Sequence, residues 1–216
     1  MSNENLVADV NDELRFDPKV DSEAIAVAAE DGVITLRGTV GSLRQKREAK
    51  KAAERLRGVA RVDNQLKVRP MGSDARADAD LRGAVLRALV LDSVIPRTID
   101  ASVDDGLVTL TGHAEWQYQR DEAESVAANV RGVIDVLDEV TLTGPSPTAY
   151  DVRQSIADAL TRNAQLDAGE LKVETDDGTV TLKGSVRSWA EHDDAVAAAW
   201  AAPGVRDVKD HIFVAY

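Results

Sequence analysis

Apolar residues recur along the chain with two periods, one helical and one alternating, and the order of these periods repeats three times. The first helical stretch carries Leu6, Val10 and Leu14, and it predicts a helix with Ser2 or Asn3 as its N-cap that is stopped by Asp17 and Pro18. The matching apolar sets are Leu81, Val85 and Leu89 behind Asp78 or Asp80 as N-cap, and Val152, Ile156 and Leu160 behind Asp151. Each repeat therefore opens with an amphipathic helix.

Two alternating strands joined by an Asp-Gly pair follow each opening helix. The first strands hold Ile25 and Val27, then Ile99, Ala101 and Val103, then Leu171 and Val173. The second strands place on one face Ile34, Leu36, Gly38 and Val40, then Val108, Leu110, Gly112 and Ala114, then Val180, Leu182, Gly184 and Val186. Asp-Gly between alternating runs predicts a tight hairpin. A glycine on the apolar face weakens a strand, so we expect a helix backbone to pass close to it.

A second helix and a third strand complete each repeat. The helix has an alanine-rich buried stripe, which is Leu43, Ala49, Ala52, Ala53 and Leu56 in the first copy, Trp116, Ala123, Val126, Ala127 and Val130 in the second, and Trp189, Ala195, Ala198, Ala199 and Ala202 in the third. We expect it to end at a glycine in the left-handed conformation. The order helix, strand, strand, helix, strand predicts an α+β fold, with two helices on one face of a three-stranded mixed sheet.

Nine glycines mark the repeat with constant spacings of 6 and 20 residues. They are Gly32, Gly38 and Gly58, then Gly106, Gly112 and Gly132, then Gly178, Gly184 and Gly204. A unit of about 70 residues present three times predicts three tandem domains, at residues 1–70, 76–144 and 147–216. The intervening segments, 69–77 and 143–148, contain proline, glycine and serine, as linkers do.

These segments resemble the BON domain, a family named for bacterial osmotically inducible and nodulation proteins. The family pattern Val-x-Val-x-x-Gly-x-Val-x-Leu-x-Gly-x-Val matches Ile25 to Val40, and Gly-Val-x-x-Val-x-(Asn/Asp)-x-Leu matches Gly58 to Leu66. The other two copies match in register at Gly132-Val133, Val136, Asp138 and Val140, and at Gly204-Val205, Val208, Asp210 and Ile212. The resemblance implies a non-enzymatic binding protein linked to osmotic or envelope stress that contacts phospholipid membranes. The family offers no shared catalytic residue.

Composition and charge narrow the class of partner. The net charge is −12, distributed as +1 over residues 1–70, −8 over 71–145 and −5 over 146–216, and this acidity argues against nucleic acid as a partner. The chain has no cysteine, which removes disulfides and thiolate metal sites. Met1 to Val10 shows no signal peptide and no apolar run is long enough to span a membrane, so we expect a cytoplasmic protein, or a periplasmic one only if a leader has been removed.

The most distinctive surface is the second helix of the first repeat. Arg44, Arg47, Lys51 and Arg55 recur at spacings of three and four, and they could bind anionic phospholipid headgroups or an acidic protein. The alternative is a solvated helix face, or one that docks on an acidic neighbouring repeat. Two other functions stay open, namely a chaperone-like scaffold that captures proteins at its sheet edges, and a potassium-sensing module of the kind the resemblance also suggests.

The remaining polar and aromatic residues point to structural roles. Asn64, Asp138 and Asp210 occupy one position of the third strand, where a hydrogen bond to a backbone group is the simplest explanation. His113, His192 and His211 show no metal-ligand spacing, and Trp116, Trp189 and Trp200 are typical helix anchors. Tyr150 and Tyr216 flank the third repeat and could pack against a neighbour. No phosphate loop, nucleophile motif or coupled carboxylate pair is present, so we expect no catalytic residue, no metal and no cofactor.

Overall fold

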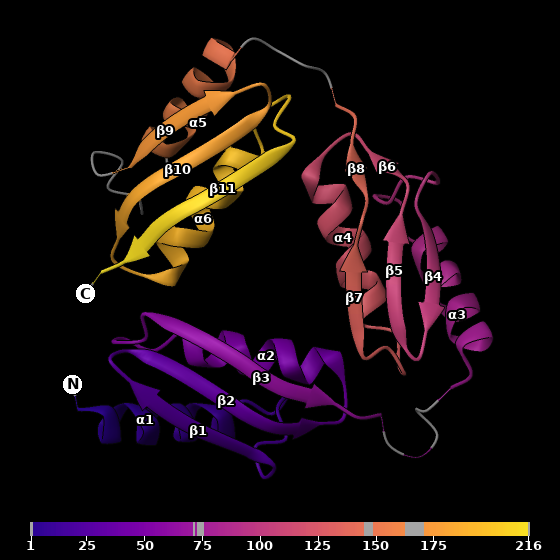
Figure 1. Cartoon of the computed structure of the whole chain (residues 1–216), viewed down its shortest axis with the longest axis vertical. Coiled ribbons are helices and arrows are strands. Elements are labelled where there is room, and N and C mark those ends of the chain that lie inside the picture. The colour runs from indigo at the N-terminus through magenta and orange to yellow at the C-terminus, as the bar shows by residue number, and fades with distance from the viewer. Residues whose placement is uncertain (1, 71, 73–75, 145–148, 163–170, 216) are drawn as a thin grey trace. The chain divides into compact units, whose positions relative to one another are not determined.

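The predicted element order occurs three times in the computed structural model, which describes residues 2–70, 72, 76–144, 149–162 and 171–215 (Figure 1). The first repeat consists of α1 (Asn3–Phe16), β1 (Ile25–Glu30), β2 (Val33–Val40), α2 (Leu43–Glu54) and β3 (Arg61–Val68). Its sheet has the order β1-β2-β3, and β2 runs antiparallel to β1 and parallel to β3. The mixed three-stranded sheet confirms the α+β prediction.

The third repeat copies this topology, and the second does so with interrupted strands. The third consists of α5 (Ala149–Arg162), β9 (Lys172–Asp176), β10 (Thr179–Val186), α6 (Trp189–Trp200) and β11 (Asp207–Val214), in a sheet ordered β11-β10-β9. The second consists of α3 (Asp78–Leu91), β4 (Asp100–Asp104), β5 (Leu107–Thr111), β6 (His113–Ala114), α4 (Gln117–Ala128), β7 (Asp135–Asp138) and β8 (Thr141–Leu142). Here β4-β5-β7 form one sheet and β6-β8 a separate pair.

The chain packs as two compact units, and the second repeat contributes to both. One unit comprises Met1–Thr111 with Glu122–Glu139, and the other comprises Gly112–Asp121 with Val140–Tyr216.

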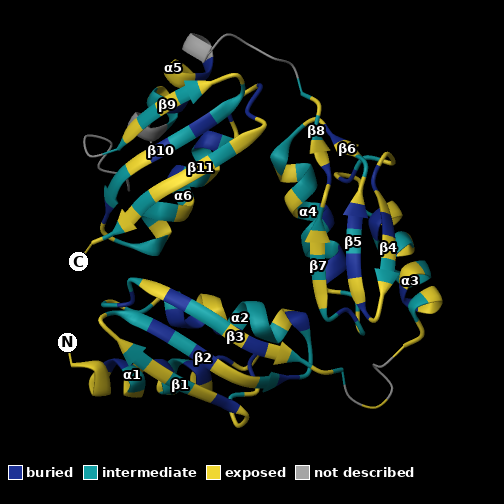
Figure 2. Ribbon diagram, viewed as in Figure 1, coloured by how far each residue is buried: buried dark blue, intermediate teal, exposed yellow. Residues whose placement is uncertain are grey.

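The cores lie between the helices and one face of each sheet, as the periodicity predicts (Figure 2). In the first repeat Leu6, Val10 and Leu14 of α1 pack with Ile34 and Leu36 of β2. The fully buried alanines of α2 and α6 are Ala49, Ala52, Ala53, Ala195 and Ala199. The opposite sheet face is polar and carries cross-strand contacts, such as the hydrogen bond from Arg37 Nε to Gln65 Oε1 (2.9 Å).

The Asp-Gly hairpins are confirmed in all three copies. Asp31, Asp105 and Asp177 have φ of 46°, 46° and 38°, and the following glycines have φ of 77–79°. Positive φ at both central residues defines a type I′ turn, whose twist matches that of the flanking strands.

The first and third glycines of each repeat lie against one another. A Cβ on Gly32 would lie 3.1 Å from Gly58 O, and the corresponding distances are 3.3 Å from Gly106 to Gly132 O and 3.0 Å from Gly178 to Gly204 O. The hairpin glycine also accepts a hydrogen bond from a residue just after the other glycine, as in Ala60 N to Gly32 O (2.8 Å). The constant spacing therefore reflects a tertiary contact between hairpin and connecting turn.

The prediction that a helix backbone passes close to Gly38 is wrong. Gly38 is exposed, and the atom that excludes a side chain is Ala24 O at the entrance to β1, 1.9 Å from an added Cβ. Its φ of 136° also disfavours any other residue, and Gly112 and Gly184 have similar values of 114° and 137°. The glycine thus serves a close approach of two strands, and no helix contact is involved.

The predicted helix ends and two N-caps also need correction. The second helices end at Glu54, Ala128 and Trp200, several residues before Gly58, Gly132 and Gly204, which adopt positive φ in the following turn. These glycines allow the positive φ that the turn before the third strand requires.

The residue at the N-cap of α3 is Ala77, because Asp78 uses its carboxylate elsewhere. Asp78 accepts hydrogen bonds from the backbone N–H groups of Asp105 (2.9 Å) and Gly106 (3.0 Å), and so stabilises the hairpin turn. Asp151 lies inside α5, which begins at Ala149, and cannot be its N-cap. The side chains of Tyr150 and Leu160, and Tyr216, lie outside the described residues.

Candidate functional site

The α2 surface is the first candidate site, and the structure separates its basic residues into two groups. Arg44 and Lys51 are exposed, have no ion pair among the described residues, and share one side of α2 with the partly exposed Arg47. Arg55 lies just beyond the helix as its C-cap, where its Nη1 contacts Glu13 Oε1 and Asp17 Oδ2, both at 3.5 Å. Arg55 thus ties α2 to α1, and Arg47 Nη2 is paired with Glu124 Oε1 of α4. Among the described residues, the outward charge of α2 that has no ion pair is carried by Arg44 and Lys51.

Acidic neighbours reduce the charge of this helix further. Lys50 Nζ lies 3.4 Å from Glu54 Oε1, and Arg47 contributes little because its guanidinium is paired with Glu124. Exposed pairs of this kind stabilise a helix only weakly, but they leave less charge for an external anion.

Asp17 is the buried end of the Arg55 contact. The backbone N–H of Lys19 donates a hydrogen bond to Asp17 Oδ1 at 3.0 Å, and this bond is the largest cause of the lowered pKa of the Asp17 carboxyl. Burial opposes this shift, and the positive charges of Lys19 and Arg55 reinforce it. The carboxylate therefore stays ionised where the chain turns out of α1.

The shared polar position of the third strand is structural in the first repeat. Asn64 Nδ2 donates to Lys46 O in α2 (2.8 Å), and Asn64 Oδ1 accepts from Leu66 N (3.2 Å). These bonds tie the helix to the strand, which is the role that the sequence favours. In the third repeat Asp210 accepts equivalently from Ile212 N (2.9 Å).

His192 on α6 lies between two carboxylates. Its Nε2 is 2.7 Å from Asp210 Oδ2 and its Nδ1 is 3.1 Å from Asp193 Oδ1, while its ring meets the edge of Trp189 at a centroid distance of 4.8 Å. The two carboxylates contact different ring nitrogens, so they do not converge on one point. Within the described part of the chain, no group of three or more histidine, aspartate or glutamate side chains could hold a metal ion.

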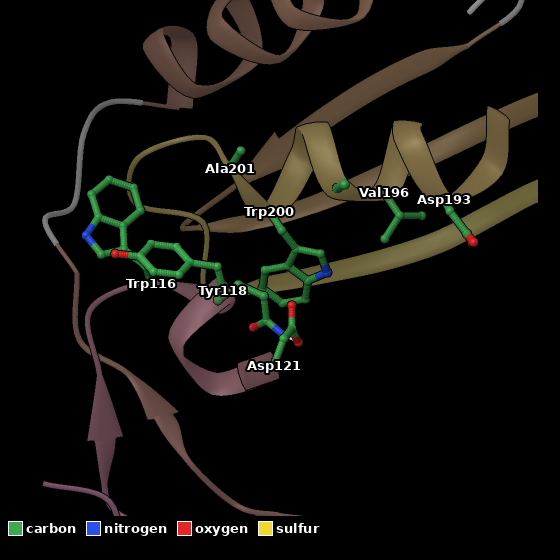
Figure 3. A pocket seen from close by; sticks show the side chains of 9 residues that line it. Trp116, Tyr118, Asp121, Asp193, Val196, Trp200 and Ala201 are labelled. Atoms are coloured by element: carbon green, nitrogen blue, oxygen red, sulfur yellow. The ribbon is translucent and has the colours of Figure 1, made fainter. Parts of the chain in front are cut away.

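A pocket in the second compact unit is lined by aromatic and acidic side chains (Figure 3). It has a volume of about 790 Å³, and its lining consists of Trp116, Gln117, Tyr118, Asp121, Asp193, Val196, Ala197, Trp200 and Ala201. Figure 3 shows Trp200 projecting from α6 toward Tyr118 and Asp121 near the start of α4.

By sequence, Trp116 and Trp200 are typical helix anchors, and Trp116 is also expected on the buried stripe of the second helix. The second expectation is wrong, because Trp116 lies before α4 and is only partly buried. Trp200 does pack partly against the core of the third repeat, but it also lines the pocket. Trp116 precedes α4, at the position where Ser42 and Ser188 form the N-caps of α2 and α6. A tryptophan cannot cap a helix, and this departure from the other copies is the sequence signal that could have identified it.

The start of α4 is secured by Gln119. Gln119 Oε1 accepts from Glu115 N (3.1 Å) and Trp116 N (3.2 Å), just as Gln45 and Glu191 accept from the N–H groups of Gly41 and Arg187. The indole of Trp116 is therefore available for contacts outside the cap.

Each of the three repeats matches the model of a known domain family. The family model described as BON domain matches residues 2–70, 77–144 and 148–216. The chain is 32% identical over 148 residues to "Osmotically-inducible protein Y" of Escherichia coli (strain K12), across 62% of this chain and 71% of that protein.

Two solved structures of CdsD, a structural protein of the type III secretion system of Chlamydia trachomatis, also align. They are 16% and 15% identical, cover 96% and 100% of this chain and 91% and 100% of the other, and give TM-scores of 0.27 and 0.28.

No helix in the described residues is long and apolar enough to cross a membrane. With the family model matched three times, over nearly the whole length, the chain belongs to the BON domain family.

Proposed function

We propose that this chain is a non-enzymatic binding protein of the osmotic response that contacts anionic phospholipid surfaces. The link to osmotic conditions rests on its similarity to an osmotically inducible protein. The observation that carries the lipid contact is the set of basic residues left on α2 once the internal ion pairs are counted.

Arg44 and Lys51 lie seven residues apart on α2, which places both on one side of the helix, with Arg47 between them. Neither has an ion pair among the described residues, so each can meet a phosphate group. A basic residue near an anionic membrane contributes about 1 kcal/mol of binding free energy. Two such residues support weak binding that falls as salt rises.

The end of α3 offers an apolar contact of the kind that membrane association uses. Val90, Leu91 and Val94 are 65%, 86% and 40% exposed, and Arg87 and Arg97 nearby are also exposed. Exposed apolar residues beside cationic ones are typical of surfaces that enter the headgroup region.

Co-sedimentation of the full chain with liposomes tests this function. We expect binding to vesicles with acidic lipid and much less to purely zwitterionic ones. The double variant Arg44→Gln, Lys51→Gln should weaken binding about tenfold or more. Lys67→Gln, on edge strand β3, is the matched control and should bind normally. Equal, negligible sedimentation with both lipids refutes the proposal.

A second candidate is a scaffold that captures protein segments by strand addition. The specific observation is that the eight-residue strands β3 and β11 each lie at the edge of their sheet, and that Phe213 of β11 is 71% exposed. Suppression of client aggregation that persists at high salt would support it. Suppression that salt abolishes would argue for the charged surface instead.

A further inference from the structure

The pocket of Figure 3 has the composition of a site for an organic cation. Three of its nine lining residues are aromatic and two are aspartates, and none is lysine, arginine or histidine. A volume of about 790 Å³ lies within the range of small-molecule sites, which is roughly 300–1,000 Å³. The pocket can therefore hold a small ligand, and its charge selects a positive one.

The aromatic residues select the kind of cation. Trp116 and Trp200 are half-buried and Tyr118 is 58% exposed. Protein contacts therefore hold one part of the two indole rings, and all three rings keep surface that a ligand can contact. The face of an aromatic ring attracts a cation, tryptophan most strongly, and the attraction grows when the cation sheds water easily. Methyl groups on nitrogen have this effect, because they spread the charge and replace the hydration shell. Val196, Ala197 and Ala201 supply the apolar surface that such methyl groups contact.

An unsatisfied acceptor in the lining provides a second, independent observation. Gln117 Oε1 is buried and has no hydrogen-bond partner among the described residues. The other end of this amide is fixed, since Gln117 Nε2 donates to Asp121 Oδ1 at 2.7 Å. An orphaned buried carbonyl oxygen is costly, and a small shift of the Gln117 side chain on ligand binding would expose it to the polarised C–H groups of an N-methyl cation.

The carboxylates complete the electrostatic argument. Asp121 and Asp193 are exposed at the pocket, in a stretch of chain whose net charge is strongly negative. They attract a cation over longer distances than the rings do, because charge–charge attraction decays more slowly with distance than attraction to an aromatic quadrupole. From these four features we propose that the pocket binds a methylated ammonium group, of which trimethylammonium is the simplest form. This site is independent of the proposed anionic-lipid contact, which uses cationic residues on other elements.

NMR of the full chain, titrated with choline chloride at constant ionic strength, tests the proposal. The three tryptophans give three indole N–H signals, and we expect those of Trp116 and Trp200 to shift while that of Trp189, outside the lining, stays fixed. The neutral isostere 3,3-dimethylbutan-1-ol and potassium chloride should leave all three in place. Equal shifts with either reagent, or no shift with choline, would overturn the proposal.

Variants at exposed positions keep the test clear of folding effects. Tyr118→Leu and Asp121→Asn should each weaken choline binding by roughly 2- to 30-fold. The control is Phe213→Ala, which removes another exposed aromatic side chain of the same compact unit and should bind choline normally. Unchanged affinity in both pocket variants would place choline elsewhere and refute the site.

The source of the ammonium group is decided by competition. Phosphatidylcholine vesicles that displace free choline from the Trp116 and Trp200 signals would identify a lipid headgroup as the ligand. Vesicles that leave choline bound would identify a free small cation.

Discussion

Replacement of Gly38 by alanine should destabilise the first repeat far more than any ordinary surface substitution. The added Cβ would lie 1.9 Å from Ala24 O and 3.0 Å from Ala24 C, whereas real Cβ contacts under 3.0 Å are essentially never seen. The backbone must therefore move by about 1 Å at the point where Thr39 N donates to the same carbonyl oxygen (3.3 Å).

Two costs add at this position. Overpacking of this kind costs about 1–3 kcal/mol, and a non-glycine residue at φ of 136° adds about 1–3 kcal/mol. A loss of about 3 kcal/mol is a large fraction of the roughly 4–10 kcal/mol expected for a domain of about 70 residues. It corresponds to a fall in Tm of the first repeat by about 12–24 °C.

Gly41→Ala is the matched control, because no atom lies within 4 Å of its added Cβ and its φ is not positive. We expect this variant to stay within about 0.5 kcal/mol of wild type. Thermal melts of the full chain, with hydrogen exchange to locate the change in β1 and β2, provide the measurement. If Gly38→Ala and Gly41→Ala melt together, the steric reasoning is wrong.

Three further predictions concern stability and organisation. Asp17→Asn should destabilise the first repeat at neutral pH, because the folded-state pKa of Asp17 is lowered below its ordinary value of 3.8. In urea melts at several pH values, the stability difference from wild type should be present above about pH 4 and should disappear as the pH falls through the folded-state pKa. Asp78→Ala should cost about 1 kcal/mol and speed amide exchange at Asp105 and Gly106, whereas Asp80→Ala, in the same helical turn, should leave that exchange unchanged. Limited proteolysis should cut first within segments 69–77 and 143–148, and early cuts inside a repeat would contradict the proposed boundaries of 1–70, 76–144 and 147–216.

The sequence by itself determined the repeat, the fold class and the family. Helical and alternating periods are local properties, so the opening helices and the three hairpins follow from residues only a few positions apart in the chain. Leu6, Val10 and Leu14 are buried as their spacing predicts, and each Asp-Gly turn has the backbone conformation that the dipeptide favours.

Only the tertiary structure decided which partner each special residue meets. Gly38 was expected to face a helix and instead meets the strand entrance at Ala24, because a spacing pattern shows that room is needed but does not show for which atoms. Arg55 fits the basic stripe by periodicity, yet its guanidinium contacts Glu13 and Asp17, residues some forty positions earlier in the chain. The same holds for Trp200, which shares a pocket with residues far back in the sequence, since side-chain contacts across such separations depend on how the elements pack.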